Sequence, residues 1–108
     1  MSHILARIQG LVAVRAYRVS DHAFLEMVED DILPLDIIHG LSDAAIVEEY
    51  PDANRGPTVL VLCRDSGGKP LHAVWSIYRL QPDIATLMIA YRPKPDRWTG
   101  DFLHRRRQ

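Results

Sequence analysis

The sequence contains a single cysteine, Cys63, among its 108 residues. A disulfide needs two cysteines, and a cysteine-based zinc cluster needs several, so both are excluded within this chain. Cys63 follows Leu62 in an apolar run, and we interpret it as an inert core thiol. A lone unpaired cysteine is typical of a reducing compartment, so we expect a cytoplasmic location.

The sequence also lacks a long hydrophobic run, since no stretch approaches the roughly 18 residues of a membrane span. The N-terminal stretch MSHILARIQGLVAVRAYR has an apolar centre, but Arg7 interrupts it and no small-residue cleavage site follows cleanly. We interpret it as a helix and expect no membrane partner. With 47% hydrophobic and 25% charged residues, the chain has the apolar content of one folded domain over residues 1–108.

Lysine and arginine are absent between Val19 and Asn54, a stretch that contains ten acidic residues. Residues 92–108 carry six basic residues against two acidic ones. The net charge of −1 therefore hides a strong segregation, which indicates two faces with different partners. A solvated acidic face and a frayed basic tail are the alternative explanation.

The first half of the chain has the apolar periodicity of helices. Ser20 is a good N-cap, and Asp21 follows it in the first turn, where the helix dipole favours an acid. Gly40 is expected to end the last of these helices. The predicted helices cover residues 3–16, 21–30 and 34–41. The second is expected to bury Ala23, Phe24, Met27 and Val28.

The second half is rich in β-forming residues, with turn signals at DANRGP, DSGGK and QPD. The predicted strands cover residues 45–50, 58–64, 70–80 and 84–92. Helices followed by an antiparallel meander predict an α+β fold with two layers. We expect two or three N-terminal helices packed on a four-stranded antiparallel sheet, with a short C-terminal helix from Trp98.

The short turns also predict the register of the sheet. Leu62 should pair with His72, and His72 with Arg92, so that these side chains share one face. The opposite face is wholly apolar and should meet the helices. The open face is mixed, with His72, Ser76, Tyr78, Thr86 and Arg92 among Leu60, Leu62, Val74 and Met88. Its apolar strip indicates a partner interface, unless the C-terminal helix covers it.

The stretch LMIAYRPKPDRW delivers Tyr91 and Arg92 to the end of a strand, and two prolines fix the exit. With His72 alongside, these groups have the chemistry of RNA cleavage, which needs no metal or cofactor because the ribose 2′-hydroxyl is the nucleophile. His72 is the candidate acid or base, Arg92 the phosphate clamp, and Tyr91 a proton donor or stacking group. The candidate substrate-binding residues nearby are Lys94, Arg97 and Trp98.

Each of these residues also has a purely structural interpretation. His72 can be a hydrogen-bonded histidine within a strand, and Arg92 can pair with Asp96 or Glu49. His22 precedes Glu26 by four residues on a predicted helix, but no further ligands at suitable spacing accompany this pair. No metal site is therefore expected.

The motifs RVS with His22, IVEEYP, GGKPLHAVWSIY and MIAYRPKPDRW resemble a family of small bacterial proteins known as a domain of unknown function, DUF4258. The resemblance covers most of the chain, from about Arg18 to Arg107. Members of that family are associated with RelE/ParE-like and MqsR-like toxins, often encoded beside a zinc-binding antitoxin. The resemblance implies a toxin fold and a type II toxin that cleaves mRNA, with RNA or the ribosome and an antitoxin as partners. It also marks His22 as a candidate substrate-binding residue.

Two other hypotheses stay open at this point. One is a non-catalytic binding or regulatory module of the same fold, which acts through protein–protein contacts or as a homodimer. The other, weaker one is a small-molecule pocket at the edge of the sheet.

Overall fold

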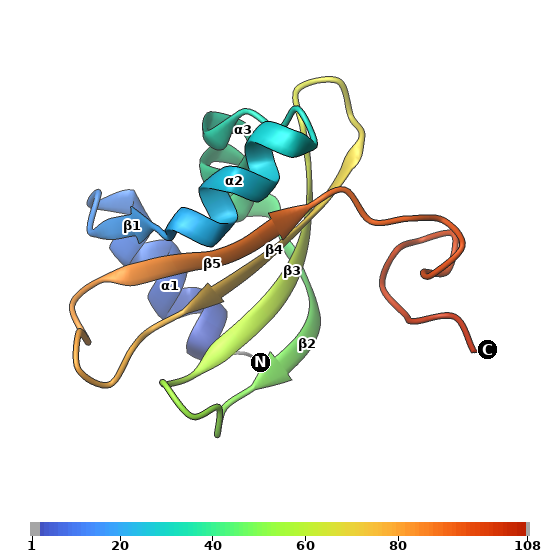
Figure 1. Ribbon diagram of the computed structural model, residues 1–108. Coiled ribbons are helices and arrows are strands. Elements are labelled where there is room, and N and C mark those ends of the chain that lie inside the picture. The colour runs from blue at the N-terminus through green and yellow to red at the C-terminus, as the bar shows by residue number, and fades with distance from the viewer. Residues whose placement is uncertain (1–2, 108) are drawn as a thin grey trace.

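The computed structural model describes residues 3–107 as helices on one side of a twisted sheet (Figure 1). The helices are α1 (His3–Ala13), α2 (Asp21–Glu29) and α3 (Pro34–Gly40), and a 3₁₀ turn, η1 (Leu41–Asp43), follows α3. The strands are β1 (Tyr17–Val19), β2 (Ala45–Tyr50), β3 (Thr58–Arg64), β4 (Pro70–Ser76) and β5 (Ala85–Tyr91).

The sheet has five strands in the order β1-β5-β4-β3-β2. Strands β2 to β5 form the predicted antiparallel meander, and Leu62 pairs with His72 as expected. β1 adds a fifth strand parallel to β5, with Tyr17 opposite Ala85. The α+β class is thus confirmed, but the expectation of four antiparallel strands is wrong. A strand of only three residues is too short to show an alternation in the sequence, so β1 is recognised only from its pairing with β5.

The core lies between the helices and one face of the sheet. Val61, Ala73 and Trp75 point to this face and are fully buried, as the alternation of the strands predicts. Ile8 of α1 and Met27 of α2 pack against them in the same cluster. Full burial of a side chain such as Val, Ile or Met contributes roughly 1.5–3 kcal/mol, so this layer is the main source of stability.

Helix α2 buries a narrower stripe than its sequence predicts. Ala23 and Met27 are buried, whereas Phe24 and Val28 are 53% and 60% exposed. The predicted burial of Phe24 and Val28 is therefore wrong. The physical reason is that α2 lies beside β5 where β1 has ended, so the sheet covers only one side of the helix (Figure 1).

A β-bulge in β5 changes the predicted register at the end of the strand. Val74 pairs with Ile89, but the next residue of β4, Trp75, pairs with Leu87, so Met88 is an extra residue. An extra residue reverses the face to which the following side chains point. Tyr91, not Arg92, is therefore opposite His72. The predicted pairing of His72 with Arg92 is wrong for two reasons. The hairpin pairs Ser76 with Thr86, a register that would place Ala90 opposite His72, and the bulge then shifts the partner of His72 to Tyr91.

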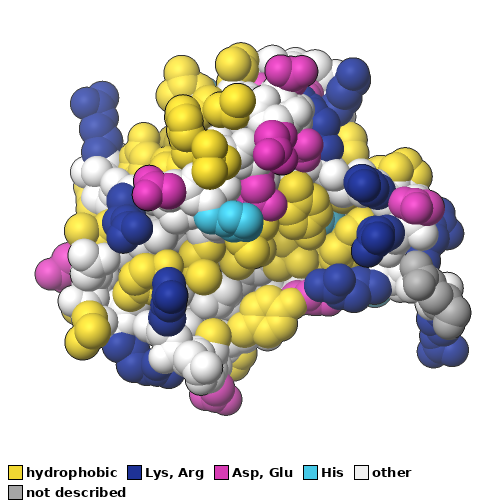
Figure 2. Space-filling model, viewed as in Figure 1, with side chains coloured by type: hydrophobic (Ala, Val, Ile, Leu, Met, Phe, Trp, Pro, Cys, Tyr) yellow, Lys and Arg dark blue, Asp and Glu magenta, His cyan; other side chains and the backbone are white. Residues whose placement is uncertain are grey.

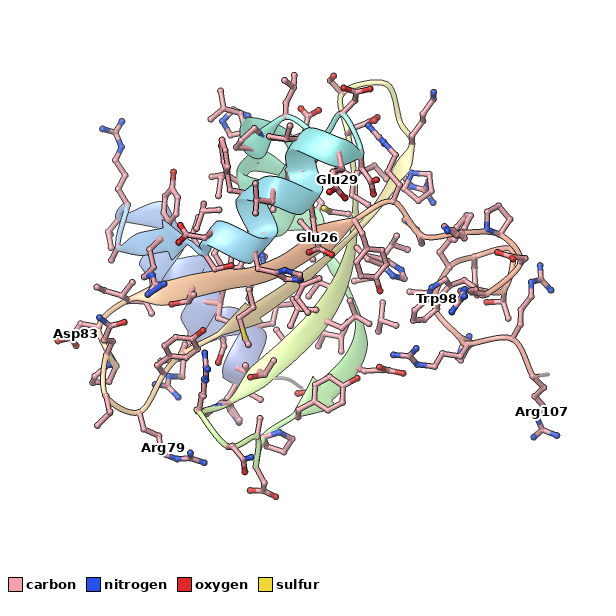
Figure 3. The ribbon with its side chains drawn as sticks, in the orientation of Figure 1. Glu26, Glu29, Arg79, Asp83, Trp98 and Arg107 are labelled. Carbon is pink, nitrogen blue, oxygen red and sulfur yellow. The ribbon has the colours of Figure 1, made fainter. Side chains whose placement is uncertain are left out.

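Side chains of α2 and its caps satisfy the edge of β5 around the bulge. The Ser20 hydroxyl donates to the Met88 carbonyl at 3.0 Å. A Glu26 carboxylate oxygen accepts from the Ala90 amide at 3.3 Å, and Glu26 lies between α2 and β5 in Figure 3. Asp30 accepts from the Arg92 amide at 3.1 Å. Backbone groups that no strand pairs with thus find partners in the helix, which fixes the bulge in place.

The segment after β5 forms a tight turn instead of the predicted C-terminal helix. Trp98 and Arg105 form an isolated antiparallel bridge. Between them, the Asp101 carboxylate accepts from the Thr99 hydroxyl and the Leu103 amide, and Phe102 has a left-handed φ of 60°. The prediction of a helix from Trp98 is wrong, because the aspartate side chain competes for backbone groups that a helix would need.

Substitution of two glycines by alanine tests the backbone conformation of the loop before β3. Gly56, before β3, has a φ of +147°, and a Cβ there would lie 2.0 Å from the Ile77 carbonyl oxygen. At Gly10, within α1, a Cβ would have no described atom beyond its own helix within 4 Å. We expect Gly56→Ala to lower the free energy of unfolding by about 3 kcal/mol or more. Gly10→Ala should raise it by about 0.5–1 kcal/mol. Urea denaturation of both variants measures this, and equal stabilities would contradict the loop conformation at Gly56.

Candidate functional site

Tyr91 and His72 face each other on the side of the sheet that the helices leave open. His72 Nε2 lies 2.9 Å from the Phe102 carbonyl oxygen, which can only accept, so Nε2 carries a proton. His72 Nδ1 lies 3.1 Å from the Tyr91 hydroxyl. In a neutral imidazole Nδ1 has no proton, so the Tyr91 hydroxyl donates to it. The tyrosine proton therefore points at the imidazole.

The C-terminal segment covers the imidazole of His72. The Trp98 ring stands perpendicular to it, with ring centres 4.4 Å apart, and the Phe102 carbonyl closes the Nε2 side. His72 is 0% exposed, whereas Tyr91 is half-buried. Tyr91 is thus the member of the pair that a molecule at the surface can reach, and His72 is accessible only through its hydrogen bond to Tyr91.

Burial sets the protonation state of both groups. It lowers the pKa of His72, and the positive charge of Arg105 acts in the same direction, while the hydrogen bond to Phe102 and the charge of Glu48 oppose it. Burial also raises the pKa of Tyr91 to about 12. A neutral imidazole beside a protonated phenol is the state that this geometry favours at pH 7.

An arginine–carboxylate pair lies against the Trp98 ring, which in turn packs on His72. Arg105 Nε and Nη2 donate to the two carboxylate oxygens of Glu48 at 2.9 and 3.0 Å. The guanidinium also lies over the Trp98 ring, 4.8 Å from its centre, and the Tyr50 hydroxyl donates to Glu48. The hydrogen bond from Arg105 lowers the pKa of Glu48, which in turn raises that of Arg105. Arg105 also has a hydrogen bond to Tyr50, so the bonds to Glu48 and Tyr50 use part of its five N–H donors and the others can meet an anion.

Arg92 lies away from this cluster, in contrast to its predicted place beside His72. Its Nη1 is 3.0 Å from an Asp65 carboxylate oxygen, and its Nε and Nη2 donate to the carbonyls of Asp30 and Asp31. Its ion-pair partner is Asp65, whereas the structural interpretation of the sequence had suggested Asp96 or Glu49. Arg92 connects the end of α2 to the turn after β3, so the structure removes the geometric basis for a phosphate clamp at this residue.

The predicted substrate-binding residues are scattered. Lys94 and Arg97 are exposed on the segment after β5, whereas Trp98 is only 4% exposed because it packs on His72. His22 lies on α2, with Nε2 3.6 Å from a Glu26 carboxylate oxygen. The structure does not gather these four side chains around Tyr91, and their roles stay predictions.

The apolar strip predicted on the open face is mostly covered. Leu60 and Leu62 are only 2% and 8% exposed, and Val74 and Met88 are half-buried. The large exposed apolar side chains of α2 and α3 lie on the other layer instead. The expectation of an exposed apolar strip on the sheet is therefore wrong for Leu60 and Leu62.

Three residues of this site were missed from the sequence: Glu48, Tyr50 and Arg105. Glu48 and Tyr50 alternate along β2 and pair with residues of β3 that face the open side. Their alternation was a usable signal. Arg105 gave none, since its contact with Glu48 depends on the turn of the C-terminal segment.

The described part of the chain holds neither a metal-ligand cluster nor a membrane helix. Within residues 3–107, no three His, Cys, Asp or Glu side chains gather as metal ligands would. In the same residues, none of the helices has the length and apolar character that crossing a bilayer requires.

The chain is thus an α+β domain with a tyrosine–histidine pair and an arginine–glutamate pair on the open face of its sheet. Residues 19–89, well over half of the chain, match the family described as Domain of unknown function (DUF4258), and the chain belongs to this family. His72 and Glu48 lie within the matched residues, whereas Tyr91 and Arg105 follow them. No curated protein and no solved structure gives a significant match.

The buried imidazole predicts a pH dependence of stability. The pKa of His72 is lower in the folded chain than in the unfolded one, so its contribution is complete above the unfolded pKa near 6.5. It declines as the pH falls from there through the folded pKa. We expect the free energy of unfolding in urea to decrease from about pH 7.5 to about pH 5.5. The decrease should be smaller in His72→Gln, whose amide does not titrate and can still donate to Phe102.

The exposed His39 provides the matched control for this measurement. His39→Gln should leave the difference between the two pH values unchanged. A His72→Gln variant with the same pH dependence as the wild type would contradict the burial of a neutral imidazole.

Proposed function

We propose that the protein is a type II toxin of the RelE/ParE- and MqsR-like kind, an endoribonuclease that cleaves mRNA without a metal ion. The observation that carries this proposal is the direction of the hydrogen bond from the Tyr91 hydroxyl to His72 Nδ1, with the Arg105 guanidinium over the Trp98 ring that packs on His72. A proton acceptor and an anion-binding group are the parts that phosphodiester cleavage by a 2′-hydroxyl needs.

The proton moves through two residues in this mechanism. The Tyr91 oxygen takes the proton of the attacking 2′-hydroxyl while its own proton passes to His72 Nδ1. The resulting imidazolium keeps its Nε2 hydrogen bond to the Phe102 carbonyl and is stabilised by the negative charge of Glu48. The 2′-oxygen forms a bond to phosphorus, and the bond to the 5′-oxygen breaks. The departing oxygen takes a proton from solvent, and the imidazolium returns its proton through Tyr91.

Arg105 would stabilise the phosphate in this mechanism. Glu48, Tyr50 and Trp98 hold the guanidinium in place, and the hydrogen bonds to Glu48 and Tyr50 use only part of its five N–H donors. A guanidinium fixed before the substrate arrives needs little reorganisation as negative charge develops.

The distribution of charge favours a nucleic-acid substrate on this face, despite the net charge of −1. Figure 2 shows Lys and Arg side chains on both flanks of the hydrophobic surface of the sheet. Many of the acidic residues belong instead to the stretch from Asp21 to Asp36, in α2, α3 and the loop between them. Local positive potential, rather than net charge, governs the contact with phosphates.

Removal of one oxygen tests the proposal. Tyr91→Phe keeps the ring and the fold but removes the hydroxyl that relays the proton, so RNA cleavage should decrease by about 100- to 10,000-fold. Cleavage is measured on purified mRNA and in extracts that contain ribosomes, together with growth arrest on induction in a bacterial host.

Tyr17→Phe is the matched control, because Tyr17 packs edge-on against Trp75 in the core layer, away from His72. This variant should be as active as the wild type. An unchanged cleavage rate in Tyr91→Phe would refute the relay. Normal growth and intact RNA with the wild-type protein, with and without ribosomes, would refute the toxin assignment.

A second candidate function, binding of a protein partner, is favoured by the helical layer. Five large apolar side chains there are 53–64% exposed, and we call them the helical apolar patch: Phe24, Leu25, Val28, Leu33 and Leu35. Figure 2 shows hydrophobic side chains gathered on this side of the molecule, next to acidic ones. Exposed clusters of this kind usually mark an interface.

The charges around the helical apolar patch select its partner. Acidic residues border it, among them Asp21, Glu29 and Asp31, and no lysine or arginine occurs between Val19 and Asn54. A second copy of the same face would bring like charges together, which is unfavourable. The complementary occupant is an amphipathic helix with apolar residues flanked by lysine or arginine, and an antitoxin segment is such a partner under the proposed function.

A synthetic helix tests this surface. A peptide with leucines at helical spacing, flanked by lysines, should bind the protein, and a scrambled peptide of the same composition should not. Leu25→Gln with Val28→Gln should abolish binding and leave urea stability nearly unchanged, because both side chains are exposed. Equal binding of both peptides, or dimerisation of the free protein that the double variant removes, would contradict a basic helical partner.

A further inference from the structure

A second group of cationic and aromatic side chains lies on the open face, far along the strands from Tyr91. The guanidinium carbons of Arg18 and Arg55 lie 6.0 and 5.8 Å from the centre of the Tyr78 ring. We call these three residues the arginine–tyrosine site. Neither arginine belongs to any of the ion pairs found within residues 3–107. Their charge is therefore available to a ligand.

Two adjoining hollows open beside the arginine–tyrosine site, and both are lined by Arg55 and Tyr78. The larger, about 490 Å³, is completed by Asn54, Arg79 and Leu80. The smaller, about 320 Å³, is completed by Ser20, His22, Met88 and Ile89. A concave, partly apolar surface with a few convergent cations has the character of a binding site.

The loop before β3 holds the arginine–tyrosine site in shape. The Arg79 amide donates to the Arg55 carbonyl at 2.8 Å, and the Arg79 guanidinium donates to the carbonyls of Ala53 and Asn54. Gly56 follows directly with a conformation that other residues rarely adopt. Arg55 is therefore presented by a tightly hydrogen-bonded turn.

The two ends of the open face are joined by the outward side chains of β5. Ile89 lines the smaller hollow and pairs with Val74, and Tyr91, two residues later, pairs with His72. Side chains two residues apart share one face of a strand. From His72 to Tyr78 the chain of β4 and its extension spans roughly 20 Å. One extended ligand can therefore contact both ends.

We infer that the arginine–tyrosine site binds a phosphate and a neighbouring base of a single RNA strand, at a distance of several nucleotides from the phosphate at Tyr91. This inference rests on the proposed function, since RNA is the substrate that brings a strand to Tyr91. Arginine forks bind phosphate oxygens in pairs, and an accessible edge or face of an aromatic ring such as half-buried Tyr78 stacks on a base of any identity. The apolar side chains of Leu80, Met88 and Ile89 line the two hollows and offer the base an apolar surface to cover.

Binding of fluorescent single-stranded RNAs of about four and about sixteen nucleotides tests the arginine–tyrosine site. The measurement uses the full chain with Tyr91→Phe, so that bound RNA stays intact. The longer RNA should bind more tightly than the shorter one. Arg18→Gln with Arg55→Gln should weaken the longer complex by about tenfold or more, and should remove most of the advantage of length. It should also reduce the slope of log affinity against log salt by about 0.7 for each phosphate that is no longer bound.

Arg7→Gln is the control for charge, because Arg7 is an exposed residue of α1, on the other layer of the molecule. It should leave the affinity for both RNAs unchanged. Tyr78→Leu should weaken the longer complex without a change in the salt slope, because stacking is not ionic. A decrease of affinity in Arg7→Gln equal to that in the double variant would reduce the effect to net charge and overturn the site.

Other outcomes separate this inference from the proposed function. RNA binding that depends on Arg18 and Arg55, without any cleavage by the wild type, would sustain the site and refute the nuclease. Cleavage by the wild type, with binding indifferent to both arginines, would do the reverse. Tighter binding of poly-glutamate than of RNA, with the same dependence on both arginines, would identify an acidic peptide as the ligand and overturn the inference.

Discussion

The arrangement of the open face depends on how α2 satisfies the unpaired edge of β5. Where β1 ends, Ser20, Glu26 and Asp30 supply hydrogen-bond partners for the backbone of residues 88, 90 and 92. Buried or half-buried backbone groups without partners would cost free energy at each position. The helix therefore holds the bulge at Met88, and the bulge determines which side chains at the end of β5 face outward.

Because of the bulge, the side chains of Tyr91 and Arg92 point in different directions and contact different partners. Tyr91 turns to the open face, where it meets His72, and Arg92 turns to Asp65 and the end of α2. A strand without the bulge, continued from the pairing of Ser76 with Thr86, would place Ala90 opposite His72 and turn the phenol to the core face. Under the proposed function, the open face would use a proton relay with a separate cation, Arg105, rather than a direct imidazole–guanidinium pair.

Much of the fold follows from the sequence, because β3 and β4 are joined by a short turn and alternate cleanly. The pairing of Leu62 with His72 and the apolar face around Trp75 were predictable for that reason. The fifth strand, the bulge and the C-terminal turn were not, since each depends on contacts with distant residues. The candidate site follows the same division. The sequence predicted that Tyr91 and His72 lie at the same end of the sheet, it paired His72 with Arg92 instead of Tyr91, and it gave no signal for the contact of Arg105 with Glu48.

The cover over His72 is made of residues that follow every strand in the sequence, Trp98 and Phe102 among them. A chain emerging from the ribosome folds from its N-terminal side first. The sheet can thus form while the imidazole of His72 is still exposed to solvent, before burial lowers its pKa. The contacts that bury His72 and orient the Tyr91 hydroxyl are complete only after Trp98 and Phe102 have emerged and folded back onto the sheet, so the site forms later than the strands that carry it.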